Sequence, residues 1–77
     1  MKIEQFKQMF LAVIAIGWTR YDETTGDWTH DLTAELAAKA NDPKQCAKIF
    51  NRVKLVAYRN CISEHDALHS LINRGKL

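Results

Sequence analysis

The spacing of apolar residues predicts a chain that is mainly helical. Between residues 3 and 16, apolar side chains recur at intervals of three and four, as on one face of a helix: Ile3, Phe6, Met9, Phe10, Val13 and Ile14. No polar residue occurs from Met9 to Ile16, so we expect this half of the helix to be covered on all sides. Gly17 is expected to end the helix.

After Gly17 the pattern changes to aromatic and β-branched residues on either side of a polar stretch at 22–27. Two short strands around a loop of about four or five residues, with Gly26 at positive φ, would satisfy this pattern. An irregular Ω-like loop over 18–29 is the alternative. We expect Trp18, Tyr21 and Trp28 to form a lid over the end of the first helix, and an exposed aromatic binding patch is the alternative.

A second, alanine-rich helix is predicted to begin near Thr29 or Asp31, either of which can cap it. It should end at Asn41, a residue type that tolerates a left-handed turn. Asp-Pro-Lys-Gln at 42–45 then predicts an N-cap, a proline at the first helical position and a glutamine that closes a capping box. In this third helix the core face spans an arc of about 140°, formed by Cys46, Ile49, Phe50, Val53, Val56, Ala57 and Cys61.

A fourth helix should be capped by Ser63, with Asp66 three residues later, and stopped by Gly75. Its apolar stripe is Ala67, Leu68, Leu71 and Ile72. The expected fold class is mainly α, or α+β if the hairpin forms: an N-terminal core helix, a short β-hairpin and a three-helix bundle, as a single domain over 1–77. A chain of 77 residues buries only about 60% of its unfolded surface, so we expect a partner or a homodimer.

The two cysteines bear on the cellular compartment. Cys46 and Cys61 are predicted to lie in one helix about 22 Å apart, too far to bridge, so a disulfide scaffold is excluded and a reducing cytoplasm is expected. Lys2 and Lys7 before the apolar run imitate a secretory signal, but Glu4 and the shortness of the run favour a structural helix. Eight apolar residues are far fewer than the roughly twenty that span a bilayer, so no membrane partner is expected.

Charge is segregated along the chain although its formal total is only +2. Residues 21–42 contain six acids and one lysine, whereas residues 43–62 contain five Lys or Arg and no acid. Ordinary exposed helices mix both signs, so the missing acids favour a working surface in the third helix. The alternatives are a solvated polar face and charge complementarity with the acidic segment of the same chain. The partner-binding residues that we predict there are Lys44, Lys48, Arg52 and Arg59, which fall within about 80° of one another opposite the core face.

The acidic, aromatic segment between the first two helices is the second candidate surface, formed by Trp18, Tyr21, Asp22, Glu23, Asp27 and Trp28. Catalytic signatures are absent: the chain has no glycine-rich phosphate loop, no nucleophile elbow and no metalloprotease motif, so we expect no enzyme activity and no cofactor. The one metal-like set is Cys46, Cys61, His65 and His69. Its spacing matches no zinc module, and we interpret it as two core thiols and two surface imidazoles without a metal.

The run Glu-Leu-Ala-Ala-Lys-Ala-Asn at 35–41 resembles the first helix and turn of helix-turn-helix DNA-binding modules, and the resemblance covers 33–52. It departs from the pattern at Asn41, where glycine is usual, and at Asp42 and Ala47, where apolar residues are usual. The resemblance implies that Lys44, Gln45 and Lys48 would lie at the front of a recognition helix, with Arg52 farther along it.

The function that we predict is a non-catalytic protein–protein interaction or regulatory module, with an acidic protein surface as its partner. In its small size and lack of cofactor motifs it is similar to the accessory proteins of phages and mobile elements that inhibit host complexes. The alternative is a small helix-turn-helix-like regulator that binds DNA or RNA with the basic face of the third helix.

Overall fold

The computed structural model describes residues 1–28 and 32–77. Its elements are α1 (Ile3–Ile14), β1 (Tyr21–Asp22), β2 (Asp27–Trp28), α2 (Leu32–Asn41), α3 (Pro43–Asn60) and α4 (Glu64–Asn73). The mainly α prediction is confirmed, and the two strands form the small hairpin expected between the first two helices. The caps predicted at Thr29 or Asp31 lie outside the described residues.

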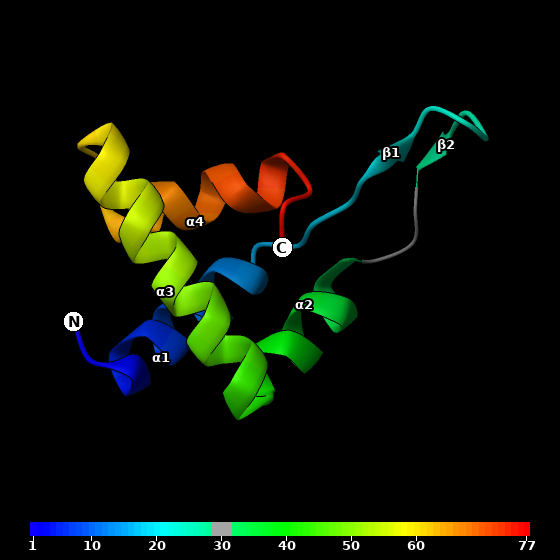
Figure 1. The fold of residues 1–77 in the computed structure, drawn as a ribbon. Helices are drawn as coiled ribbons and strands as arrows, with labels where there is room; N and C mark the ends of the chain where they lie inside the picture. Colours follow the sequence, from blue (N-terminus) through cyan, green and yellow to red (C-terminus); the bar gives the residue numbers. More distant parts are fainter. Residues whose placement is uncertain (29–31) are drawn as a thin grey trace.

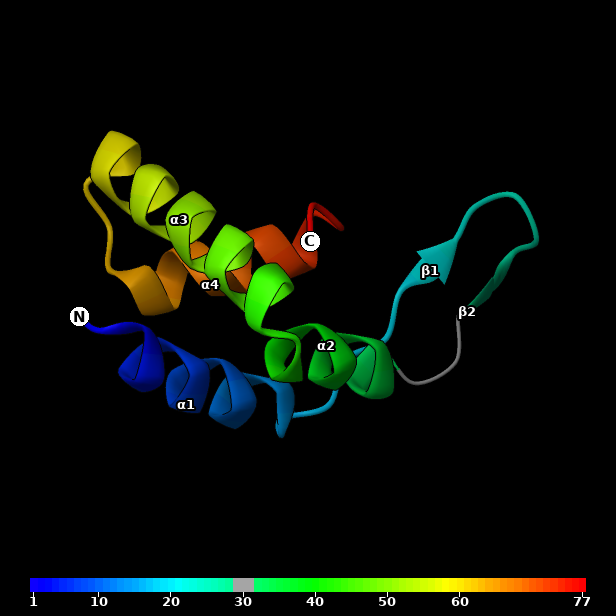
Figure 2. The same ribbon diagram turned by 60° about the horizontal axis from the view of Figure 1, so that its bottom comes forward.

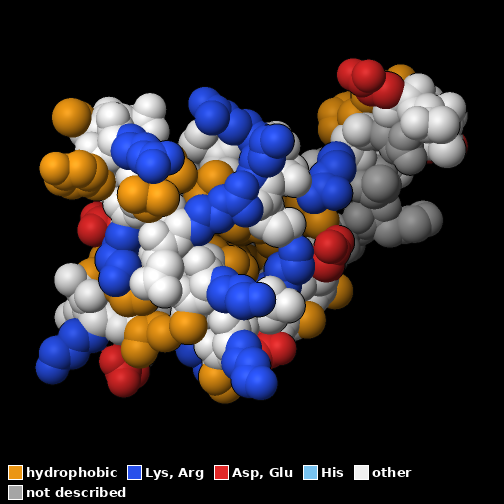
Figure 3. All heavy atoms as spheres, viewed as in Figure 1, with side chains coloured by type: hydrophobic (Ala, Val, Ile, Leu, Met, Phe, Trp, Pro, Cys, Tyr) orange, Lys and Arg blue, Asp and Glu red, His pale blue; other side chains and the backbone are white. Residues whose placement is uncertain are grey.

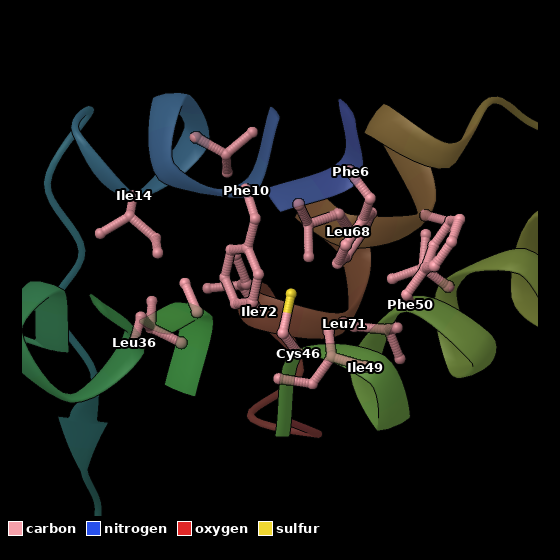
Figure 4. Close-up of a cluster of buried hydrophobic side chains, with 14 of the residues drawn as sticks. Phe6, Phe10, Ile14, Leu36, Cys46, Ile49, Phe50, Leu68, Leu71 and Ile72 are labelled. Atoms are coloured by element: carbon pink, nitrogen blue, oxygen red, sulfur yellow. The ribbon is translucent and has the colours of Figure 1, made fainter. Parts of the chain in front are cut away.

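The core lies where the four helices meet, and α1 packs against each of the other three (Figures 1 and 2). Phe6 and Phe10 of α1 are fully buried, and the Phe6 ring stacks on Phe50 of α3 with 4.7 Å between the ring centroids. Figure 4 shows these rings among the aliphatic side chains of α2 and α4. Burial of aromatic rings contributes strongly to the stability of so small a core. The predicted apolar stripes of α1 and α4 are therefore confirmed as core faces, Ile3 and the half-buried Met9 excepted.

The prediction that the second half of α1 is covered on all sides is wrong. Ala12 and Ala15 are exposed, and Ile16, just after the helix, is 66% exposed. The other three helices cover one side of α1, which is sufficient to bury Phe10, Val13 and Ile14. The outward side carries the small side chains of Ala12 and Ala15, whose exposure costs little because they carry little apolar area, and Ile16 lies beyond the last helical residue, Ile14.

Local capping signals set the starts of α3 and α4 at the predicted residues, but the capping box expected at the start of α3 is not formed: Gln45 donates its backbone N–H to the cap and its side chain does not close a box. The Asp42 carboxylate oxygen Oδ1 accepts hydrogen bonds from the backbone N–H groups of Lys44 at 2.9 Å and Gln45 at 3.4 Å. Pro43 is the first helical residue of α3. The Ser63 hydroxyl accepts a hydrogen bond of 3.1 Å from the N–H of Asp66. Since α2 ends at Asn41, Asp42 alone joins α2 to α3.

The predicted end of α2 at Asn41 is confirmed, but two details of the predicted helix ends are wrong. Asn41 is not left-handed; it is helical, and its side-chain Nδ2 donates a hydrogen bond of 2.9 Å to the carbonyl oxygen of Ala37. The left-handed residue is Cys61, with φ of 54°, which ends α3. Cys61 is exposed rather than part of the core face, because the chain leaves the helix at Asn60 and the arc calculated for a continuous helix no longer applies. Val56, also placed on that face, is only half-buried at its edge.

The hairpin pairs Tyr21 with Trp28 and Asp22 with Asp27, and Gly26 in its four-residue loop has the expected positive φ, at 73°. Figures 1 and 2 both show it projecting away from the helices. Tyr21 is 49% exposed and Trp28 67% exposed, so the predicted lid is wrong for these two residues. Trp18 alone packs against the core, because one indole is enough to close the end of α1.

Candidate interaction surfaces

The four cations predicted as a partner-binding stripe all lie exposed on α3: Lys44, Lys48, Arg52 and Arg59. Figure 3, with α3 in front, shows Lys and Arg side chains spread over this face. Within the described part of the chain, no acidic side chain pairs with any of the four; the ion pairs found there are Lys39 with Glu35 and His65 with Asp66, each at 3.9 Å. The positive charge of this face is therefore not neutralised by the described residues.

Arg52, one of the four cations, also forms a structural hydrogen bond. The guanidinium Nη1 of Arg52 donates a hydrogen bond of 2.6 Å to the carbonyl oxygen of Lys76 and so holds the C-terminal segment against α3. Beside this contact lies a groove of about 160 Å³ whose lining includes Lys48, Arg52 and Leu77. Arg52 therefore contributes to structure as well as to charge, whereas no such bond holds Lys44, Lys48 or Arg59 among the described residues.

Sequence reasoning missed two large side chains on the same outer face. Leu55 is 47% exposed and Tyr58 is 85% exposed. At about 100° per residue, Leu55 falls inside the arc of the four cations and Tyr58 lies about 40° beyond its edge at Lys44. The periodicity that located the cations could therefore have found both. We call the set Lys44, Lys48, Arg52, Leu55, Tyr58 and Arg59 the basic face of α3.

The second predicted surface is the hairpin. The rings of Tyr21 and Trp28 meet edge to face across the two strands, with centroids 5.4 Å apart. Glu23 and Asp27 are exposed, and neither forms an ion pair with another described residue. In the sequence, residues 21–28 include three acids and no Lys or Arg. The hairpin thus exposes aromatic surface and negative charge together.

Trp18, also predicted for this surface, sits apart from the exposed pair. It is half-buried, and its ring lies 5.3 Å from the ring of His69 on α4. A groove of about 300 Å³ separates the hairpin aromatics from the helices, with Trp18, Leu32 and Ile72 on its helical side. The structure therefore places Tyr21 and Trp28 in the hairpin with Glu23 and Asp27. Trp18 precedes the hairpin and packs against the helices instead.

The cysteines and histidines do not assemble into one site. His65 and His69 lie side by side on α4 with ring centroids 4.6 Å apart. Among residues 1–28 and 32–77, no group of three or more His, Cys, Asp or Glu is close enough to hold a metal ion. Cys46 is buried at the opposite end of α3 from Cys61.

Cys46 lines a groove of about 180 Å³ between α1, α2 and α3, together with Ile3, Lys7, Ala40 and Pro43. Burial raises the pKa of the Cys46 thiol, and the positive charge of Lys7 offsets a smaller part of that rise. The thiol is therefore protonated at neutral pH, which makes it a poor nucleophile.

Among residues 1–28 and 32–77, no helix has both the length and the apolar character needed to cross a membrane. Comparison with known proteins finds no matching protein family, no matching curated protein and no matching solved structure. The candidate surfaces are thus defined by their own geometry and charge.

Proposed function

We propose that the protein is a non-catalytic binding module that docks the basic face of α3 on an acidic protein surface. The observation that carries this proposal is the exposure of Leu55 and Tyr58 among cations on a helix without any acid. A module of this kind acts by occupying its partner's surface, as an inhibitor or regulator does. A cytoplasmic location is part of the proposal.

The residue types on this face suit a protein interface. Tyrosine and arginine are enriched among the residues that contribute most to binding, and the surrounding charges steer encounter and select the partner. Tyr58 is the more exposed of the two large apolar side chains on this face, at 85% against 47% for Leu55. Lys48 and Arg59 lie on the same outer side of α3 and can contact carboxylates around an apolar centre.

The test is capture of a partner from an extract of the native host by immobilised protein. The altered protein is Lys48→Glu/Arg59→Glu, which leaves Arg52 in place because Arg52 holds the C-terminal segment. The control is Lys2→Glu/Lys7→Glu, which makes the same change of net charge at the N-cap and in the first half of α1. Thermal melts of all three proteins establish that they are folded.

We expect wild type and the control to capture the same protein, and the α3 variant to bind it at least about tenfold more weakly. Tyr58→Ala should weaken the complex by about 2 kcal/mol or more if the ring is at the centre of the contact. Undiminished capture by the α3 variant would remove the basic face from the interface.

Nucleic acid is the second candidate partner, favoured by the exposed Tyr58 ring among cations, since bases stack on such rings. The one-residue link at Asp42 counts against a helix-turn-helix mode, in which the turn has about three or four residues. Binding to duplex DNA or to RNA that falls steeply with salt, and that Lys48→Glu/Arg59→Glu abolishes, would favour this candidate over the first.

A further inference from the structure

The chain exposes two surfaces of opposite charge that each carry large apolar side chains. The hairpin offers Tyr21 and Trp28 with Glu23 and Asp27, and the basic face offers Leu55 and Tyr58 with cations. In the described part of the chain, the acids of the hairpin and the cations of the stripe form no ion pairs. Among the described residues, each surface therefore lacks a partner of opposite charge of the kind that the other surface carries.

The fold keeps these surfaces apart. Neither strand packs against a helix in the described residues, and Figures 1 and 2 both show the hairpin projecting beyond the end of the bundle near the start of α2. Figure 3 shows acidic side chains on the hairpin, at some distance from the cations over α3. The two surfaces can therefore come together only between two molecules or after a large rearrangement of one.

We propose that the acidic hairpin of one copy docks on the basic face of α3 of a second copy. A two-fold arrangement makes this contact twice, once in each direction, and leaves neither surface open. Glu23 and Asp27 then face Lys48 and Arg59, while Tyr21 and Trp28 cover Leu55 and Tyr58. Aromatic rings also attract the arginine guanidinium. The contact therefore uses both the charged and the apolar side chains of each surface.

Self-association of this kind covers the basic face of α3, which is the surface proposed above to bind the acidic partner. The regulatory consequence of dimerisation therefore rests on the proposed function, whereas dimerisation itself does not. The second copy and the acidic partner would compete for the same cations. A high protein concentration would hold the protein in a masked form, and the partner would have to displace the second hairpin. The hairpin is then a self-inhibitory element that acts between molecules.

The experiment measures mass by sedimentation velocity over a range of protein concentrations, at about 50 mM and about 500 mM salt. Variant one is Glu23→Lys/Asp27→Lys, which makes both surfaces basic. Variant two is Lys48→Glu/Arg59→Glu, which reverses two of the four cations of the stripe and so removes its net positive charge. All the changed residues are exposed, and circular dichroism with thermal melts establishes that each variant is folded.

We expect the wild type to dimerise more strongly at the lower salt concentration, and each variant alone to dimerise at least about tenfold more weakly. An equal mixture of the two variants should recover the dimer, because the unaltered hairpin of variant two meets the unaltered basic face of variant one. In the second contact, the substituted positions of the two chains face each other with opposite signs. A chain with all four substitutions has the signs exchanged at the four positions that face one another and should also dimerise by itself.

Three results would overturn the inference: a wild type that stays monomeric at every concentration, single variants that dimerise as well as wild type, or a mixture that stays monomeric. Variant one separates this inference from the proposed function, because it is altered only in the hairpin. If it captures the host partner as wild type does while failing to dimerise, both proposals hold. If wild type never dimerises but still captures the partner through α3, only the self-association is wrong.

Discussion

The indole Nε1 of Trp18 donates a hydrogen bond of 2.9 Å to the carbonyl oxygen of Val13 in the last turn of α1. The same carbonyl oxygen also accepts a hydrogen bond of 3.2 Å from the backbone N–H of Ile16, so the indole adds a second donor to the last turn of α1. The backbone carbonyl of Trp18 also accepts a hydrogen bond of 2.9 Å from the N–H of Leu32. Trp18 thus ties the end of α1 to the start of α2.

Replacing Trp18 by Phe should lower the free energy of unfolding by about 1 to 2 kcal/mol, because the ring packing is largely kept while the hydrogen bond to Val13 is lost. Trp28→Phe, in the exposed hairpin, should change it by less than about 0.5 kcal/mol. Urea denaturation followed by circular dichroism measures both. Equal effects of the two substitutions would show that the indole bond contributes nothing to stability.

Ile14, the last residue of α1, and Ile16, two residues later, have the same side chain in buried and exposed surroundings. Ile14 is 3% exposed and Ile16 is 66% exposed. Ile14→Asp should leave no cooperative thermal transition, because an unpaired charge in the core costs several kcal/mol and a domain of this size has little more than that in total. Ile16→Asp should melt close to wild type. A cooperative melt of Ile14→Asp near the wild-type temperature would remove Ile14 from the core.

The sequence was sufficient where local chemistry decides the structure. Asp42, Pro43 and Ser63 set helix starts through hydrogen bonds within three residues and a fixed proline φ, so tertiary context is not needed to find them. The stripe on α4 followed from helical periodicity in the same way. The positions of Lys48 and Arg59 on the outer face of α3 also followed from periodicity, because helix geometry fixes direction once the core face is known.

Prediction failed where the outcome depended on which elements meet. The hairpin was expected to cover α1, but the other helices already bury Phe10 and Ile14, so Tyr21 and Trp28 remain outside. Cys61 was placed in the core because nothing before it signals the end of α3. The hydrogen bond from Arg52 to Lys76 depends on where the C-terminal segment lies, which no local pattern specifies.

Cys61 adopts a left-handed backbone with φ of 54°, a conformation that costs a residue with a side chain about 1 kcal/mol or more. Cys61→Gly should therefore stabilise the fold by about 0.5 to 1 kcal/mol, after the larger entropy of glycine in the unfolded chain is allowed for. Cys61→Ala keeps the strained backbone and serves as the control. A glycine variant no more stable than the alanine variant would show that the strain at this position is negligible.

The two thiols should differ in reactivity and in their effect on stability at alkaline pH. Cys61 is exposed and should react with a thiol reagent at least about a hundredfold faster than the buried Cys46, which needs an opening of the fold. Burial raises the folded-state pKa of Cys46 above its ordinary value of 9.0. The unfolded chain therefore loses this proton first, and the contribution of Cys46 to stability is complete below about pH 9 and falls as pH rises past it.

Comparing Cys46→Ala with Cys61→Ser isolates this effect. Unfolding free energies measured between neutral and alkaline pH should fall less steeply for Cys46→Ala than for Cys61→Ser, which keeps the buried thiol. Identical slopes would mean that the titration of Cys46 does not differ between the folded and unfolded chains.

The projecting hairpin has a consequence for how the molecule exchanges hydrogen with the solvent. Its two strands stand clear of the helices, so their amide protons can exchange with deuterium through local opening, at a rate independent of global stability. Amides in the middle of α3, near the fully buried Val53, exchange only when the whole bundle opens. The backbone of the basic face is consequently preorganised, so binding there orders mainly side chains, whereas the hairpin also loses backbone entropy when it docks.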